Sequence, residues 1–129
     1  MSDRARAAVV VRDEERRVAL IRRVRDGHTY YVFPGGGIQS GEAPADTAVR
    51  EAREELGVRV VLGPRLLIEE SNGQTAHYFS ASIVGGEFGT GTGQEMRDAD
   101  THEAVWMDVA ELPHYRVYPR ALAAILTGG

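Results

Sequence analysis

The sequence contains no cysteine. This absence excludes a disulfide framework, a thiolate metal site and a thiol nucleophile, and it fits a reducing compartment. Long apolar runs are also missing: the short run at residues 7–11 falls far below the roughly 18 apolar residues of a membrane span. We therefore expect a soluble cytoplasmic protein with no membrane partner.

The chain has no surplus of positive charge, because its formal net charge is −4. Broad, salt-driven attraction to nucleic acid needs clustered basic residues, so we expect no extended nucleic-acid partner. A phosphorylated ligand would have to be held locally. Divalent cations could then lie between the phosphates and a carboxylate-rich site.

A length of 129 residues is typical of one domain, so we assign residues 1–129 to a single domain. An apolar fraction of 43% and a charged fraction of 26% are those of an ordinary folded protein. Disorder of the whole chain is excluded by this composition.

The first third of the chain is predicted to form β-strands. Two β-branched runs, residues 7–11 and 18–21, flank a charged segment and predict a hairpin. Residues 30–33 predict a third strand, and the Pro-Gly-Gly-Gly at 34–37 predicts a loop.

Residues 44–56 predict a helix, with Pro44 in the first turn and Gly57 as the stop signal. The apolar positions recur at three- and four-residue spacing. We expect the side chains facing the core to be those of Ala48, Val49, Ala52 and Leu56.

The remaining sequence predicts further sheet and a closing helix. We expect strands at 58–61, 66–68, 75–84 and 104–107, a hairpin turn at Asn72-Gly73, a mobile glycine-rich loop at 85–93 and a helix at 119–126. This order indicates a mixed α+β domain.

The helix at 44–56 carries three acidic residues on one side. At about 100° per residue, Glu51, Glu54 and Glu55 fall within an arc of roughly 100°. An acidic helix face is most often simply solvated, but Glu51 and Glu55 repel each other at i,i+4. A hard cation such as Mg²⁺ turns this repulsion into coordination.

These residues sit in a longer pattern that resembles the Nudix box, G-x5-E-x7-R-E-U-x-E-E-x-G-U, where U is a bulky apolar residue. Residues 36–58 match all seven fixed positions, and the one departure is Ala52 at a U position. The matching fixed residues are Gly36, Glu42, Arg50, Glu51, Glu54, Glu55 and Gly57.

The resemblance implies the Nudix fold, an α/β/α sandwich around a mixed β-sheet. It also implies that Glu51, Glu54 and Glu55, with the carbonyl of Gly36, bind Mg²⁺ or Mn²⁺. Arg50 would orient the glutamates, and Glu42 would support that network or lie near a second metal ion. Family members commonly recruit another glutamate from a later loop, for which Glu95 is the first candidate and Glu103 the second.

The implied reaction is hydrolysis of a pyrophosphate bond in a nucleoside diphosphate linked to another moiety. A short MutT-like chain favours a nucleoside triphosphate, including oxidised ones, cut to a monophosphate and pyrophosphate. ADP-ribose and dinucleoside polyphosphates stay open, as do a non-catalytic nucleotide sensor and, less favoured by the negative charge, an RNA 5′-end pyrophosphohydrolase.

Substrate contacts outside the box rest on placement alone. We expect Arg23 to contact phosphate or nucleoside, and Tyr31 or Phe79 to stack on a base, although aromatic residues on strands more often pack the core. The four histidines are dispersed and predict no zinc site. Relatives include homodimers, and the sequence leaves the oligomeric state open.

Overall fold

The computed structural model of the protein describes residues 5–71, 73–98 and 100–128. Its strands form two four-stranded sheets. The first, ordered β4-β1-β6-β5, contains β1 (Arg6–Val11), β4 (Gly35–Gly37), β5 (Val58–Ser71) and β6 (Gln74–Gly86). The second, ordered β7-β2-β3-β8, contains β2 (Arg17–Arg25), β3 (His28–Val32), β7 (His102–Asp108) and β8 (Val117–Tyr118).

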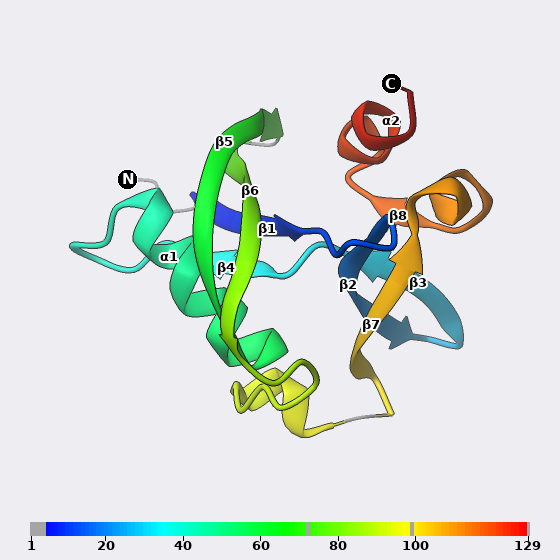
Figure 1. Cartoon of the computed structure of the whole chain (residues 1–129), viewed down its shortest axis with the longest axis horizontal. Helices are drawn as coiled ribbons and strands as arrows, with labels where there is room; N and C mark the ends of the chain where they lie inside the picture. Colours follow the sequence, from blue (N-terminus) through cyan, green and yellow to red (C-terminus); the bar gives the residue numbers. More distant parts are fainter. Residues whose placement is uncertain (1–4, 72, 99, 129) are drawn as a thin grey trace.

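Two α-helices flank these sheets from different sides. Helix α1 (Pro44–Glu51) lies beside the first sheet, and α2 (Arg120–Gly128) lies next to β8 at the other end of the molecule (Figure 1). Shorter helical segments are η1 (Ala52–Leu56), η2 (Gln94–Arg97) and η3 (Val109–His114). No helix in the described ranges is both long and apolar enough to span a bilayer.

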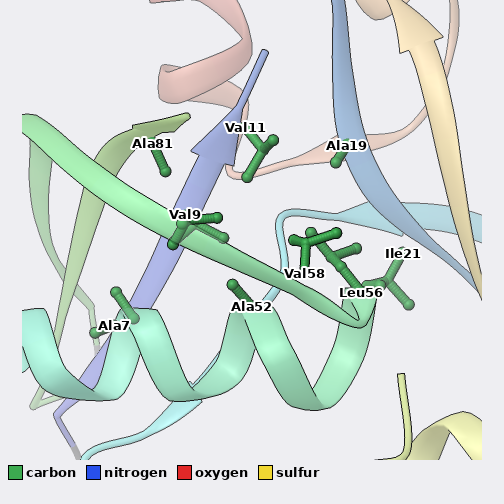
Figure 2. Close-up of a cluster of buried hydrophobic side chains, with 11 residues drawn as sticks. Ala7, Val9, Val11, Ala19, Ile21, Ala52, Leu56, Val58 and Ala81 are labelled. Atoms are coloured by element: carbon green, nitrogen blue, oxygen red, sulfur yellow. The ribbon is translucent and has the colours of Figure 1, made fainter. Parts of the chain in front are cut away.

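Strand β1 is buried on both faces, which explains its unbroken apolar sequence. Alternate residues enter two separate core clusters because side chains alternate across a strand. Ala7, Val9 and Val11 pack toward α1 and η1, as Figure 2 shows for Val9 near Ala52 and Leu56. Ala8 and Val10 pack toward the opposite cluster, which contains residues of α2 and η3.

The predicted fold class is therefore confirmed: helices cover both sides of mixed sheets. Each sheet combines antiparallel pairs with one parallel pair, β1 with β6 in the first and β3 with β8 in the second.

The predicted hairpin of residues 7–11 and 18–21 is wrong as a strand pairing. The turn itself forms, because the Asp13 carboxylate accepts hydrogen bonds from the backbone N–H groups of Glu15 and Arg17. Only an isolated bridge, Arg12 to Val18, joins the two arms, which then enter different sheets. Local sequence located both strands, but their partners come from distant segments.

Two segments expected to be loops are tied into the fold. Residues 35–37 form β4, because their backbone groups pair with β1. In the glycine-rich segment 85–93, the first two residues belong to β6 and the rest is fixed to the end of η1. The N–H of Gly89 donates to the carbonyl of Leu56 at 2.9 Å, and that of Gly93 donates to the carbonyl of Glu54 at 2.8 Å.

The strands at 58–61 and 66–68 are parts of one long strand, β5, whose pairing with β6 shifts register between Leu62 and Arg65. Of the predicted turn between these strands, Gly73 has a φ of +77° and Asn72 lies outside the described residues. The strand at 104–107 and the helix at 119–126 are confirmed, as β7 and α2.

The predicted helix is confirmed, although its last turn, η1, is a wider π-helical turn that ends at Gly57 with φ +82°. Ala48, Ala52 and Leu56 are fully buried as expected. Val49 is 39% exposed, so its predicted core position is wrong. The buried face extends to the polar side chains of Thr47 and Glu51, on the side of Ala48 and Ala52 away from Val49.

Replacing Leu56 with alanine should lower the free energy of unfolding by about 2–5 kcal/mol, because a fully buried side chain would leave a cavity. Val49→Ala on the same helix should cost no more than roughly 1 kcal/mol. Urea unfolding followed by circular dichroism measures both values. Equal losses in the two variants would contradict this assignment of the buried helix face.

Candidate functional site

A cavity of about 400 Å³ opens where β4, helix α1–η1 and the two sheets meet. Acidic residues of the helix form one wall, and residues of β1, β2 and β7 form the facing wall. The lining residues used below are Arg6, Ile21, Arg23, Val32, Gly36, Arg50, Glu51, Glu54, Glu55, Glu95, Met96 and His102.

The acidic wall follows from the helical register. Glu51 and Glu55 lie one turn apart and Glu54 lies beside them, so all three line the same cavity. Glu51 and Glu55 are 8% and 7% exposed, whereas the side chain of Glu54 is 39% exposed. The three carboxylates predicted to converge therefore line one cavity, although no three acidic side chains of the described residues form a compact metal-binding group.

Arg50 binds the acidic wall from one side. Its Nη1 donates to Oε2 of Glu51 at 3.1 Å and to Oε1 of Glu54 at 3.2 Å, and its Nη2 donates to the carbonyl of Gly37 at 3.2 Å. Hydrogen bonding to Glu42 is the largest influence that raises the pKa of Arg50. This guanidinium is a fixed cation that spans β4 and the helix.

Glu42 is a further hydrogen-bond acceptor of Arg50. Its carboxylate accepts hydrogen bonds from Nε of Arg50 at 2.7 Å, the hydroxyl of Thr47 at 2.7 Å and the backbone N–H of Gln39 at 3.0 Å. The bond from Arg50 and then that from Gln39 lower the pKa of Glu42 to about 2. Glu42 is therefore ionised and occupied as an acceptor, which suits a positioning residue.

Glu51 and Glu55 form a buried acidic pair. Only one donor compensates Glu55 among the described residues, the backbone N–H of Gly35 at 3.2 Å. Burial first, and then the nearby carboxylate of Glu51, raise the pKa of Glu55 well above its ordinary range. Two neighbouring buried carboxylates share a proton or bind a cation.

Gly36 permits this arrangement because it lacks a side chain. A Cβ atom on Gly36 would lie 2.3 Å from Oε2 of Glu51. The backbone of β4 can therefore approach the carboxylate of Glu51 closely.

The oxygen ligands of the acidic wall fit a hard divalent cation that keeps part of its water shell. They fit a cation coordinated by protein atoms alone less well. Within the described ranges, no three acidic or histidine side chains form a ready-made cation cage. Mg²⁺ usually keeps several waters and takes one or two carboxylates, so an incomplete shell of buried oxygens suits it. Zn²⁺ would require nitrogen or sulfur ligands that this wall does not supply.

Glu95 also lines the cavity, on η2. Its segment is held to the acidic wall by the hydrogen bond between Gly93 and the carbonyl of Glu54. Its charge is near enough to contribute to the raised pKa of Glu55. Glu103 lies outside the cavity lining, with its carboxylate 3.7 Å from Nη1 of Arg22.

Of the predicted substrate contacts, the structure brings only Arg23 to the cavity. Tyr31 alternates to the opposite face of β3, where it packs against the second core cluster and the ring of Tyr115. Phe79 packs against the first core cluster and stacks on His77, away from the lining. Strand alternation, rather than residue type, decides which of these side chains reach the cavity.

Among the lining residues that sequence reasoning missed are two that can carry positive charge, Arg6 and His102. Arg6 precedes the apolar run of β1, and His102 precedes the predicted strand at 104–107. Extending that strand by two residues would have placed His102 on the same face as Ala104. No local sequence pattern identifies either residue as part of a site.

Gly36→Ala should weaken binding of Mn²⁺ about tenfold or more, because the added methyl group displaces the Glu51 carboxylate. Stability should change little, since the displaced atoms end a flexible side chain. Gly37→Ala is the matched control, because a Cβ there meets no atom within 4 Å. Calorimetric titration with Mn²⁺ measures the affinity, and similar values for both variants would contradict this role of Gly36.

Comparisons with known proteins agree with the geometry. The family model of the NUDIX domain matches residues 2–125. An uncharacterized Nudix hydrolase of Bacillus subtilis, YvcI, is 27% identical over 109 residues, covering 80% of this chain and 65% of the relative. The 8-oxo-dGTP diphosphatase of Escherichia coli is 39% identical over 54 residues, covering 40% of this chain and 42% of the relative.

A solved structure from work on MutT of Aliivibrio salmonicida and Vibrio cholerae superposes with a TM-score of 0.76 at 19% identity, covering 96% of both chains. At that identity the likeness concerns the fold. The matches to the two curated relatives span less than two thirds of their lengths.

Proposed function

The chain belongs to the NUDIX domain family, and from that premise we propose that it is a pyrophosphohydrolase that cuts a phosphoanhydride bond in a nucleoside diphosphate derivative. The observation that carries the proposal is the buried pair Glu51 and Glu55, which faces the backbone of Gly36 inside a cavity that also contains arginine side chains. Such a pair is costly unless a cation compensates it.

Glu51, Glu54, Glu55 and the carbonyl of Gly36 are the proposed ligands of Mg²⁺, for which Mn²⁺ can substitute. A cation held there would neutralise charge on the pyrophosphate and lower the pKa of a bound water. A cation between the acidic wall and the phosphates would reduce the repulsion between the carboxylates and an anionic substrate.

The residues of the chain have separate proposed tasks. Arg50 fixes the Glu51 and Glu54 carboxylates, and Glu42 fixes Arg50. Glu95, which is exposed and lines the same cavity, is the proposed general base that takes a proton from the attacking water. Arg23 and Arg6 offer guanidinium donors to the phosphates or nucleoside on the facing wall.

The proposed substrate is a nucleoside triphosphate, including an oxidised one, which is converted to a monophosphate and pyrophosphate. The similarity to an 8-oxo-dGTP diphosphatase supports this choice. ADP-ribose and dinucleoside polyphosphates are the alternatives, since the acidic wall addresses the pyrophosphate alone.

Mg²⁺ should support release of monophosphate from at least one member of a panel of nucleoside triphosphates, ADP-ribose and dinucleoside polyphosphates. EDTA should abolish the release, and Glu54→Gln should lower kcat by roughly a hundredfold, because one carboxylate of the acidic wall is lost. Chromatography of the products identifies the bond cut. Activity that persists in EDTA, or in Glu54→Gln, would refute a metal-dependent mechanism on this wall.

Glu95→Gln should lower kcat by about a hundredfold with little change in KM, as expected for loss of a general base. Glu103→Gln is the matched comparison, because Glu103 lies outside the cavity lining. Steady-state measurements of kcat and KM on the best substrate distinguish the two variants. Wild-type kcat in both variants would place the base within residues 36–58 instead.

A further inference from the structure

His102, the first residue of β7, has an unusual position for a polar side chain. It lines the cavity, yet its Nε2 is buried and has no hydrogen-bond partner. It is the one buried side-chain nitrogen or oxygen without a partner in the part of the chain that the structure describes. Buried polar atoms are nearly always paired, so Nε2 is expected to have a partner that the described residues do not supply.

The other ring nitrogen holds the imidazole in place. Nδ1 of His102 lies 3.0 Å from Oγ1 of Thr101, and that oxygen lies 3.4 Å from the carbonyl of Asp98. The hydroxyl can donate its one proton to either acceptor, so the contact is compatible with both neutral tautomers of His102. Nε2 accepts a hydrogen bond in one tautomer and donates one in the other.

Neighbouring strands place His102 in a row with two other side chains. Arg23 of β2 is the register partner of both His102 on β7 and Tyr30 on β3. The guanidinium carbon of Arg23 lies 5.6 Å from the centre of the Tyr30 ring. Stacking occupies the face of the guanidinium and leaves the N–H groups at its edge for a ligand.

An apolar strip adjoins this row on the same face of the sheet. Ile21 lies two residues before Arg23 and is the register partner of Val32, and both line the cavity together with Met96. A polar edge next to an apolar strip suits a flat heteroaromatic ring better than a phosphate or a hydrated sugar.

We propose that His102 is a specificity-determining residue whose Nε2 forms a hydrogen bond with the polar edge of the nucleobase, beside the donors of Arg23. This inference rests on the proposed function for its substrate class and adds the position where the base is recognised. Thr101 is the positioning residue that holds Nδ1 of His102. A base without a polar group at the matching position leaves Nε2 unpaired and binds more weakly.

The test compares kcat and KM for the four common ribonucleoside triphosphates in wild type and His102→Phe, which keeps the ring and removes the nitrogens. Wild type should prefer its best base over its worst by about tenfold or more in kcat/KM. In His102→Phe the preference should fall to within about threefold, through a higher KM for the preferred base. His114→Phe, on an exposed histidine outside the lining, should retain the wild-type preference.

Two further variants separate recognition from packing. His102→Gln keeps a hydrogen-bonding group at this position and should restore part of the preference. Thr101→Val should weaken the preference while Thr101→Ser retains it. An unchanged preference in His102→Phe, or an equal loss for all four bases, overturns the proposal, as does a loss that follows replacement of the ribose by deoxyribose instead of the base.

Calorimetric binding of the four nucleoside monophosphates makes the inference independent of turnover. Base preference in binding that His102→Phe abolishes supports it even if no substrate is hydrolysed, an outcome that would count against the proposed function alone. Metal-dependent hydrolysis with base preference intact in His102→Phe would instead refute the role of His102 and leave the proposed function standing.

Discussion

The guanidinium of Arg50 is the contact on which the candidate site depends. It binds the carboxylates of Glu42, Glu51 and Glu54 and the carbonyl of Gly37, and so connects β4 to the helix that follows it. Only a planar fork with five donors can satisfy acceptors in several directions at once, and the chain contains no lysine. Without this cation, Glu51 would be a buried charge with no compensating group from the helix.

Close backbone approach is the second requirement of the site. Glycine at position 36 lets β4 come within contact distance of Glu51. Gly91 has the same effect on the other side, since a Cβ there would lie 2.5 Å from the carbonyl of Glu54. The two approaches enclose the end of the helix between β4 and the segment that carries Glu95.

The acidic wall and the facing wall of the cavity differ in their chemistry. The acidic wall carries Glu51, Glu54 and Glu55, and the facing wall contains Arg6, Arg23 and His102. A nucleotide has a matching polarity, because its phosphates demand cations and its base offers directional hydrogen bonds and an apolar face. A negative net charge of the whole chain is therefore compatible with binding an anion at one internal site.

The sequence by itself determined the helix at 44–56, its acidic face and the family pattern, because helical periodicity and a fixed spacing are local properties. It located most strands but not their partners: β1 and β2 separate into two sheets, and residues 35–37 become a strand because β1 accepts them.

Only the tertiary structure decided which residues outside the box meet the cavity. Arg23 reaches it while Tyr31 does not, and His102 enters through the register of β7 with β2. The placement of His102 depends on pairing between segments about 80 residues apart, and single-sequence patterns carry no information on such pairing. The sequence of the helix thus determines the acidic wall, whereas the facing wall depends on how the strands pair in the sheets.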